Sequence, residues 1–600
     1  MPERPRLARV AAHPVMAALV VAGVLHLLWW WLLANSGGDI AAQDAWAEFA
    51  RTHPGSAYNL AWYGGMHPVS YSILSPYVMA LLGVRTTMIV VGTVSSGLLA
   101  LVLVRSNALR RPLWPALYGA VALTGNAVSG RVTFGLGTMF ALAAIAVLLP
   151  PPATTPAPVP AQPTPLRRPR AVALGALAAL ATAASALAGL FLGIVAAALW
   201  LQGRRRRAYV LGLPPVAVVA FSAWAFPFSG EQPMPAGSII LPFLAGVLGF
   251  ALVPATWRTV RVTSAVYAVA VVLVWLVPSP IGSNVTRLGL LFGGVLMVAL
   301  TTSVEPLRRP RLRWVAMVPA TTTLAVAIVA SSIWQVATAG RDAVNTRPTQ
   351  AWTSDVQPLL DQLGERDANL GRTEVVPSRS HREAAALAPY VNLARGWNRQ
   401  ADAERNALFY TEGALTAASY RDWLDLWAVH YVVLPEGEPD VAAQAEAALV
   451  EGGLRYLRPV WSDASWRLYE VKRPAPLADA PAVVVRFDEA GVVLMLPAAA
   501  TVVVRIPASP WLSLVDAAGT ALQPTPFAGP DSEDAYLDGC LGVTVPDEPD
   551  PADPDAPPEV WTVLHAPRAG VYRIAAPYKL PPGTACPEEA ETSARPPGDR

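Results

Sequence analysis

Two carboxylates follow the first apolar segment of the chain and are the clearest candidates for chemistry. The apolar run at 14–34 leads into Gly37-Gly-Asp39-Ile-Ala-Ala-Gln43-Asp44. These two acidic side chains lie five residues apart, at the membrane rim where the chain first emerges. One of them could act as a general base, and the other could contact a phosphate or bind a metal ion. We therefore expect Asp39 and Asp44 to lie at a reactive site.

Aromatic side chains continue along the same loop. Trp62-Tyr63-Gly-Gly-Met-His67-Pro68 is followed by Tyr71 and Tyr77. Such rings can stack on a sugar, or they can anchor a loop in the lipid headgroup region. Both interpretations stay open for Tyr63 and His67.

Polar residues in the later external turns are candidates for binding phosphate. Arg131 and the turn Asn284-Val-Thr-Arg287 place two arginines on the expected external side, against the usual bias of positive charge toward the cytoplasm, and Glu231 lies in another such turn. An arginine fork can hold the phosphate of a lipid carrier bidentately. The alternative is plain solvation of helix ends.

Two features of the polar C-terminal part complete the candidates. The run Ala394-Arg395-Gly-Trp397-Asn-Arg399-Gln400 either contacts a sugar or joins a soluble domain to the membrane. Cys540 and Cys586 are the two cysteines of the chain, and a pair in a segment outside the cytoplasm favours a disulfide over two unrelated thiols.

The elements that must position these residues are membrane helices. The chain is 53% hydrophobic and 15% charged, and its apolar runs are concentrated before about residue 335. A span needs about 20 apolar residues. The predicted spans are 14–34, 86–104, 113–129, 132–150, 171–186, 187–202, 208–226, 237–254, 260–278, 286–304 and 314–336.

Arginine clusters set the expected orientation of these spans. Eleven crossings put every cluster on the cytoplasmic side, with the N-terminus inside and the C-terminus outside. The run 171–202 is divided near Ser185–Gly189 because arginines flank both of its ends. The apolar run 66–83 is then an interfacial or re-entrant segment of the first external loop. The clusters are Arg4–Arg9, Arg105–Arg111, Arg167–Arg170, Arg204–Arg207, Arg258–Arg261 and Arg308–Arg313.

The domain organisation follows from these patterns. We predict an α-helical polytopic membrane domain at 1–340, with an external loop at 35–85 and a Pro-rich cytoplasmic linker at 150–170. An extracytoplasmic α/β unit follows at 341–475, then a β-sandwich at 476–587 and a disordered tail at 588–600.

At the level of layout, this chain resembles the GT-C class of membrane glycosyltransferases. The resemblance lies in the Gly-Asp motif after the first helix, the long first external loop, the break at Ser185-Ala-Leu-Ala-Gly189, and the external stretch from Ala394 to Pro435. It implies that Asp39 is the base that activates an acceptor hydroxyl for attack on a polyprenyl-phosphate sugar, and that Asp44 is the second candidate for this role. It also implies that the attack inverts the anomeric carbon. The donor phosphate would lie near Arg131 or Arg287. This chain has Asp-Ile where many members have adjacent acidic residues, and this departure leaves open whether the site uses a divalent metal. No other cofactor is implied.

The expected function is therefore sugar transfer from a lipid-linked donor to an envelope glycan or lipid, in the plasma membrane of a bacterium. The scarcity of Lys together with abundant Arg, Ala and Pro indicates an actinobacterium. A transporter or lipid flippase and a non-catalytic scaffold are the alternatives. The near-zero net charge gives no case for nucleic-acid binding.

Overall fold

The computed structural model describes residues 13–150, 166–228, 230–305, 319–523, 538–544, 560–579 and 584–586. The chain forms two compact units. The first, which we call the helical unit, consists of Met1–Asn35 and Val69–Asn345. The second, the mixed unit, consists of Ser36–Pro68 and Thr346–Arg600.

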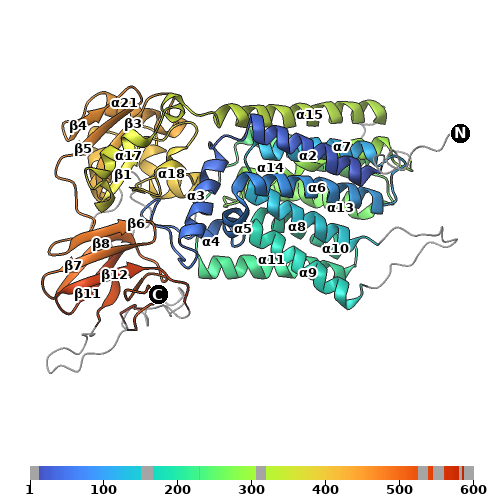
Figure 1. Cartoon of the computed structure of the whole chain (residues 1–600). Helices are drawn as coiled ribbons and strands as arrows, with labels where there is room; N and C mark the ends of the chain where they lie inside the picture. The colour runs from blue at the N-terminus through green and yellow to red at the C-terminus, as the bar shows by residue number, and fades with distance from the viewer. Residues whose placement is uncertain are drawn as a thin grey trace. The chain divides into compact units, whose positions relative to one another are not determined.

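The helical unit has a helix at each predicted span, and neighbouring helices run side by side (Figure 1). Contacts join α2 to α6, α6 to α8, α8 to α9 and α10 to α11. The helices are α2 Pro14–Leu32, α6 Val84–Arg105, α7 Leu113–Val128, α8 Val132–Leu148, α9 Arg168–Ala184, α10 Ala186–Leu201, α11 Arg205–Ala225, α12 Ile240–Leu252, α13 Arg258–Leu276, α14 Thr286–Thr301 and α15 Ala320–Asn345.

By length and composition, 6 helices among the described residues could cross a membrane: α2, α6, α11, α13, α15, and α14 together with the 3-10 turn η2 Gly282–Val285. Shorter apolar helices lie at Val132–Leu148, Ala186–Leu201 and Ala236–Leu252, the last of which includes the 3-10 turn η1 Ala236–Ile239. These helices support the prediction of a membrane protein. The number of crossings and their orientation stay predictions.

The break between α9 and α10 lies at Ser185, where the sequence predicted it. Ser185 has extended backbone angles, φ −158 and ψ 116. The hydroxyls of Ser72 and Ser75 donate to the Ala184 carbonyl at 2.9 Å each, so side chains bind an acceptor at the end of α9. The two helices are therefore separate segments, as the flanking arginines require.

The apolar run 66–83 does not form one long helix. It contains α4 Pro68–Tyr71 and the 8-residue α5 Ser75–Leu82, and Gly83 with φ 82 separates α5 from α6. An eight-residue helix is about 12 Å long, well short of a bilayer core of about 30 Å. This agrees with the prediction that the run is not a span.

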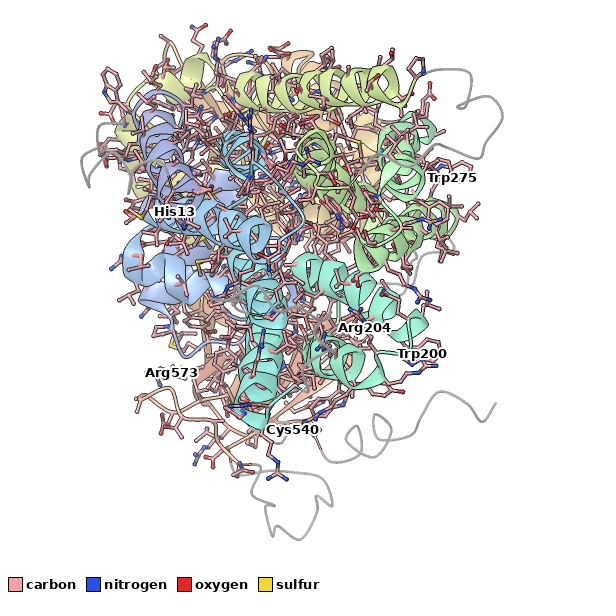
Figure 2. All side chains as sticks on the ribbon, turned by 90° about the vertical axis from the view of Figure 1, so that its right-hand side faces the viewer. His13, Trp200, Arg204, Trp275, Cys540 and Arg573 are labelled. Atoms are coloured by element: carbon pink, nitrogen blue, oxygen red, sulfur yellow. A yellow bond between two sulfur atoms is a disulfide. The ribbon has the colours of Figure 1, made fainter. Side chains whose placement is uncertain are left out.

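Arginines from different predicted clusters meet at shared helix ends. Arg105 donates to the Ala146 carbonyl at 2.7 Å and Arg170 to the Val147 carbonyl at 2.6 Å, so both reach the C-terminal end of α8. Arg205 lies over the ring of Trp200 of α10, 3.4 Å from its centroid, and Arg204, labelled in Figure 2, donates to the Thr259 hydroxyl at the start of α13 at 3.5 Å. The arginines at 4–9 and 308–313, most of the linker and the predicted tail lie outside the described residues. The linker ends earlier than predicted, because α9 already begins at Arg168.

The first part of the mixed unit is an α/β layer with a five-stranded sheet of order β2-β1-β3-β5-β4. β1 pairs in parallel with both β2 and β3, whereas β5 pairs antiparallel with β3 and β4. The strands are β1 Arg372–Val375, β2 Asn392–Leu393, β3 Val429–Pro435, β4 Leu457–Ser462 and β5 Trp466–Val471. The helices are α16 Gln350–Thr353, α17 Gln357–Gly364, α18 Glu383–Ala386, α19 Arg399–Arg405, α20 Ala417–Leu426 and α21 Gln444–Glu451, with the 3-10 turns η4 Ala368–Leu370, η5 Ala407–Phe409 and η6 Val441–Ala443.

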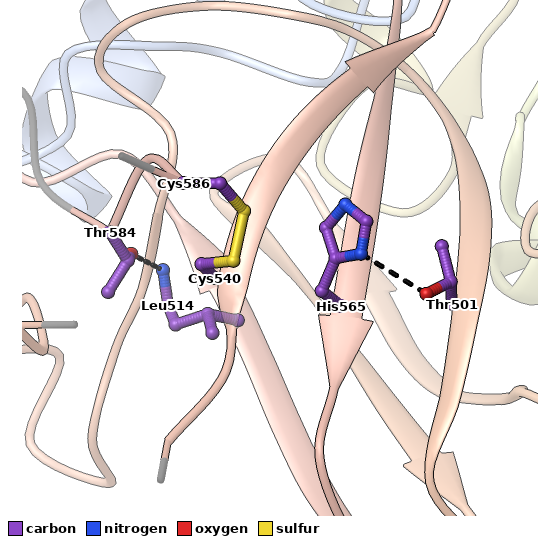
Figure 3. Close-up of a disulfide and its surroundings, with 6 residues drawn as sticks. All are labelled: Thr501, Leu514, Cys540, His565, Thr584 and Cys586. Atoms are coloured by element: carbon purple, nitrogen blue, oxygen red, sulfur yellow. Dashed lines mark hydrogen bonds between the residues drawn. A yellow bond between two sulfur atoms is a disulfide. The ribbon is translucent and has the colours of Figure 1, made fainter. Parts of the chain in front are cut away.

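The second part has two sheets that share one apolar core, of orders β10-β11-β8 and β6-β7-β12-β9. A disulfide joins Cys540, at the start of β10, to Cys586 (Figure 3). Beside it, the Leu514 amide donates to the Thr584 hydroxyl at 2.6 Å. The strands are β6 Val483–Asp488, β7 Gly491–Leu496, β8 Ala500–Pro507, β9 Ser513–Leu514, β10 Cys540–Thr544, β11 Trp561–Ala566 and β12 Gly570–Ala575.

The predicted boundary at 340 needs a correction. Residues 36–68, which we expected to belong to an external loop of the membrane domain, fold with the mixed unit and contain α3 Asp39–Thr52. The Leu393 amide of β2 donates to the Ala61 carbonyl at 2.8 Å, and Tyr58 and Leu60 belong to the core of the two-sheet part. Burial of these apolar side chains fixes the segment there.

Candidate functional site

Asp39 is the first residue of α3, and two glycines fix its position. A Cβ on Gly37 would lie 2.2 Å from the Thr346 carbonyl oxygen, so no side chain fits there. Gly38 has φ +59, which glycine adopts readily, and its amide donates to the Ser380 carbonyl at 2.7 Å. The start of α3 is therefore held against two later segments of the mixed unit, and the half-buried Asp39 is held with it.

Asp44 lies on the same helix but does not share a face with Asp39. Each helical residue turns by about 100°, so side chains five positions apart point about 140° away from each other. The Gln43 side-chain amide donates to the Asp39 carbonyl at 2.7 Å, a contact along the helix. One face of α3 can therefore present Asp39 or Asp44 but not both, and the catalytic role of each stays a prediction.

The loop after β1 contains a buried histidine between two carboxylates. His381 Nδ1 lies 3.3 Å from Glu383 and Nε2 lies 3.4 Å from Asp440. Its ring stacks on Trp397, with centroids 3.7 Å apart and planes at 13°. Burial alone would lower the pKa of His381, but the two carboxylates outweigh it and raise that pKa above its ordinary value. Trp397 therefore has one ring face covered by His381.

The carboxylates of this cluster are themselves held in place. Ser378 donates its hydroxyl to Glu383 at 2.7 Å, and Arg399 donates to Asp440 at 2.9 Å. Burial raises the pKa of Asp440, but His381 and Arg399 outweigh it and hold the pKa well below its usual range. The cluster braces the loop that includes Ser380, the residue whose carbonyl binds the start of α3. The loop that contains His381 is thus joined to the start of α3 by one backbone hydrogen bond.

Arg395 lies in a second, deeper cluster. Its guanidinium donates to both oxygens of Asp402, at 3.0 and 2.7 Å, and to Glu446 at 2.9 Å. Glu374 of β1 lies 4.0 Å away, and the Phe409 ring centroid lies 4.0 Å from the guanidinium carbon. Arg395 is 4% exposed, so it has no surface to offer a sugar. Its partners all lie within the mixed unit, so it is an internal counter-ion and not the expected joint between a soluble domain and the membrane.

Two carboxyl groups of this deeper cluster retain protons more readily than free carboxyls do. Burial, with the neighbouring Glu446 carboxylate, raises the pKa of Glu374 well above its ordinary value. Burial also raises the pKa of Glu446, which accepts from the Tyr420 hydroxyl at 2.9 Å. Sequence reasoning missed this cluster because its members come from β1, α19, α20 and α21.

Tyr63 and His67 are buried inside the mixed unit. Tyr63 is 0% exposed, and its hydroxyl accepts from the Asn398 amide at 2.9 Å. Arg405 donates to the Tyr63 carbonyl at 2.9 Å. His67 Nδ1 lies 3.0 Å from the Ala57 carbonyl, and burial lowers the pKa of His67 to about 4. These side chains lock the segment in place, which corrects both the sugar-stacking and the headgroup-anchoring interpretations.

In the helical unit, Arg131 and Arg287 lie at the same end of α8. Arg131 precedes the first residue of that helix and pairs with Asp342 at 3.0 Å. Arg287 donates to Asn284 at 2.6 Å, and its guanidinium lies 5.4 Å from the ring of Phe134 in the first turn of α8. Both arginines thus lie near the start of α8, and their binding of phosphate stays a prediction.

The remaining candidate, Glu231, is exposed in the segment between α11 and η1. Asp39 and Asp44 belong to the mixed unit, whereas Arg131, Asn284, Arg287 and Glu231 belong to the helical unit. Among the described ranges, no group of three or more His, Cys, Asp and Glu side chains has the arrangement of a metal site.

Comparison with known families identifies one segment of the chain. A family described as a domain of unknown function (DUF8823) matches residues 479–591, which include most of the two-sheet part. No curated protein matches the sequence.

Several solved structures resemble the chain. One is the arabinofuranosyltransferase AftD from mycobacteria, with 16% identity and a TM-score of 0.44 over 76% of this chain and 40% of that one. Another is ArnT from Cupriavidus metallidurans bound to undecaprenyl phosphate, with 14% identity and a TM-score of 0.39 over 76% of this chain and 97% of that one. The chain thus matches less than half the length of the mycobacterial enzyme. Likeness at these scores supports no activity for this chain.

Proposed function

We propose that the protein is a membrane glycosyltransferase that moves a sugar from a polyprenyl-phosphate donor to a glycan or lipid acceptor outside the cytoplasm. The observation that carries the proposal is the placement of Asp39. It is the first carboxylate after the first apolar helix, and Gly37 and Gly38 fix its position on the mixed unit. A general base must be held within hydrogen-bond reach of the proton that it removes. The resemblance of this Gly-Asp motif to the GT-C class supports the same role.

The proposed reaction is a single displacement. Asp39 accepts the proton of an acceptor hydroxyl, whose oxygen forms a bond to the anomeric carbon of the sugar. The bond from that carbon to the phosphate oxygen breaks, and polyprenyl phosphate leaves with the electron pair. Attack from the face opposite the leaving group inverts the anomeric centre.

Arg131 and Arg287 are the proposed partners of the donor phosphate. Both guanidinium groups lie at one end of α8, and a guanidinium binds phosphate oxygens in a fixed fork. Arg131 already pairs with Asp342 at 3.0 Å, so phosphate binding there would exchange one anion for another.

The test is sugar transfer by the purified full-length protein, with a panel of radiolabelled polyprenyl-phosphate sugars and an envelope glycan extract. Asp39→Asn keeps the shape of the side chain and removes the base, and we expect transfer to fall by about 10²-fold or more. Asp44→Asn is the matched control on the same helix, and we expect its rate to stay within about threefold of wild type.

Each outcome has a distinct meaning. Equal loss in both variants would indicate that α3 contributes charge without a specific base. Transfer that is unaffected by Asp39→Asn would contradict the role of Asp39. Absence of transfer with every donor would contradict the proposal and favour a transporter, a lipid flippase or a scaffold.

A further inference from the structure

A pocket in the mixed unit borders the His381 cluster through Ser378, and its lining includes neither Asp39 nor a member of the Arg395 cluster. Its cavity volume is about 250 Å³. Val376, which follows β1, and Leu434 and Pro435, at the end of β3, form part of its wall. The pocket therefore opens at the carboxyl ends of two parallel strands.

The topology of the sheet makes this edge a place where ligands bind. β1 lies between β2 and β3, and all three are parallel. The chain leaves β1 toward β2 on one side, and it leaves β3 toward α21 and β4 on the other side. Because the two connections leave in opposite directions, a crevice stays open between the ends of β1 and β3. Open α/β sheets bind their ligands in such a crevice, where the order of the strands reverses.

One polar group in the wall has no partner. Thr349 is 7% exposed, and its hydroxyl makes no hydrogen bond to any part of the chain that the structure describes. A buried hydroxyl without a partner is costly. Gly437, with φ +121, brings its backbone so close that an added Cβ would lie 3.0 Å from the Thr349 Cβ. A ligand hydroxyl in the pocket would supply the missing partner.

The charges of the lining decide the class of ligand. Three carboxylates, Glu436, Glu438 and Glu451, line the pocket with one guanidinium, Arg467, which pairs with Glu451 at 2.8 Å. This excess of negative charge disfavours a phosphate. An ammonium group is a donor without acceptor capacity, so it could bind the carboxylates but could accept nothing from the guanidinium or the threonine hydroxyl. A sugar hydroxyl both donates and accepts, and it therefore suits carboxylates, a guanidinium and a threonine together.

We infer that this pocket binds a neutral saccharide of one or two rings. Its volume lies just below the range of about 300–1,000 Å³ for drug-sized ligands, which sets the limit on ring number. Pro439, Ala447 and Ala448 are lining residues that keep exposed apolar surface, and they can pack on the C–H faces of a ring. The inference goes beyond the transfer reaction, because it concerns binding in the mixed unit and does not depend on Asp39.

The experiment is equilibrium binding by calorimetry to the full-length protein, in lauryldimethylamine oxide, a detergent without a sugar head group. The probes are methyl glycosides of glucose, galactose, mannose and arabinose, with maltose as a two-ring probe. We expect at least one probe to bind with a dissociation constant on the order of 1 mM. Inorganic phosphate and ethanolamine serve as anionic and cationic comparisons.

Two variants of α21 separate the pocket from the rest of the surface. Ala448 lines the pocket and is exposed, so Ala448→Trp fills the opening without disturbing the core. Ala445 is equally exposed on the same helix and does not line the pocket, so Ala445→Trp is the matched control. We expect about tenfold weaker binding for the first and less than twofold change for the second.

Thr349→Val removes only the hydroxyl, and we expect about fivefold weaker binding, the scale of one neutral hydrogen bond. Melting curves check that each variant stays folded. The inference fails if wild type binds no glycoside at about 20 mM. It also fails if both tryptophan variants weaken binding equally, or if phosphate or ethanolamine binds more tightly than every glycoside.

Discussion

Replacing Arg395 with leucine should destabilise the mixed unit strongly, because three carboxyl groups depend on this one cation. Arg395→Leu keeps much of the apolar volume and removes the charge that binds Asp402 and Glu446. Removing one partner of a buried ion pair costs about 3–5 kcal/mol. Loss of the contact with the Phe409 ring adds about 0.5–2 kcal/mol. Burial already raises the pKa of Glu446, so this group can take up a proton and offset part of the loss. We therefore expect the free energy of unfolding to fall by about 4 kcal/mol in total.

The assay is thermal unfolding of the purified protein at one scan rate, followed by tryptophan fluorescence. Trp423 reports on the cluster, because its indole N–H donates to Asn406, which in turn donates to Asp402. One kcal/mol shifts the midpoint by about 2–4 °C in domains of about 150–250 residues, so the variant should melt about 10 °C lower. Arg458→Leu removes the same charge from an exposed pair on β4, and its midpoint should move by less than about 2 °C.

The double variant Arg395→Leu/Asp402→Leu should regain part of the loss, since replacing both members of a buried pair by apolar groups is often nearly neutral. A midpoint for Arg395→Leu within about 2 °C of wild type would refute the reasoning. So would an equal drop in the Arg458→Leu control.

Four further predictions concern pH, backbone fit and the disulfide. Folding lowers the pKa of His67 from 6.5 to about 4, so this histidine costs no stability above pH 6.5 and costs more as the pH drops toward 4. In melting curves measured from pH 7.5 to 4.5, His67→Gln should therefore lose less stability than wild type. The pKa of His381 is raised on folding, so this histidine stabilises the fold below pH 6.5 and its contribution to stability is lost as the pH rises. The difference in melting temperature between wild type and His381→Gln should therefore shrink from pH 6 to 8. Gly37→Ala should lower the free energy of unfolding by about 1–3 kcal/mol and reduce sugar transfer, because its Cβ would meet a carbonyl oxygen. A Cβ on Gly55 would have nothing within 4 Å, so the control Gly55→Ala should change neither the melting temperature nor the transfer rate. Cys540→Ala should cost about 4 kcal/mol, the loop entropy of a link between residues 46 apart, and wild type in reducing agent should show the same drop in midpoint.

The helices could be located from sequence because each signal was local. A bilayer core demands a long apolar run, and such a run is visible without knowledge of its neighbours. The division at Ser185 followed from arginines at both ends of one run. The mixed unit's Trp466–Val471 strand likewise follows from its own β-branched and aromatic composition.

β1 could not be located in this way. Its sequence Arg-Thr-Glu-Val contains two charged residues, yet all four are buried. Arg372 donates to the carbonyls of Trp427 and Arg505, and Glu374 lies beside Arg395. The partners that make burial tolerable are supplied by distant parts of the chain, so no local pattern predicts them.

The positions of the candidate site residues divide in the same manner. Asp39 could be proposed as the base from its place after the first apolar run alone. The burial of Tyr63 and His67 could not be predicted in this way, because it depends on residues such as Asn398 that come more than 300 positions later.

The division of the mixed unit into two stretches of sequence also orders events during synthesis. Ser36–Pro68 leaves the ribosome long before Thr346, the first residue of its partner stretch. At about 5–20 residues per second, the intervening chain of about 280 residues takes about 15–60 s to make. For that time Tyr58, Leu60 and Trp62, all buried in the finished protein, have no core to enter. The nascent protein therefore exposes an apolar segment beside its first helix until the C-terminal stretch arrives, and a chaperone acting at this stage would have that segment as its substrate.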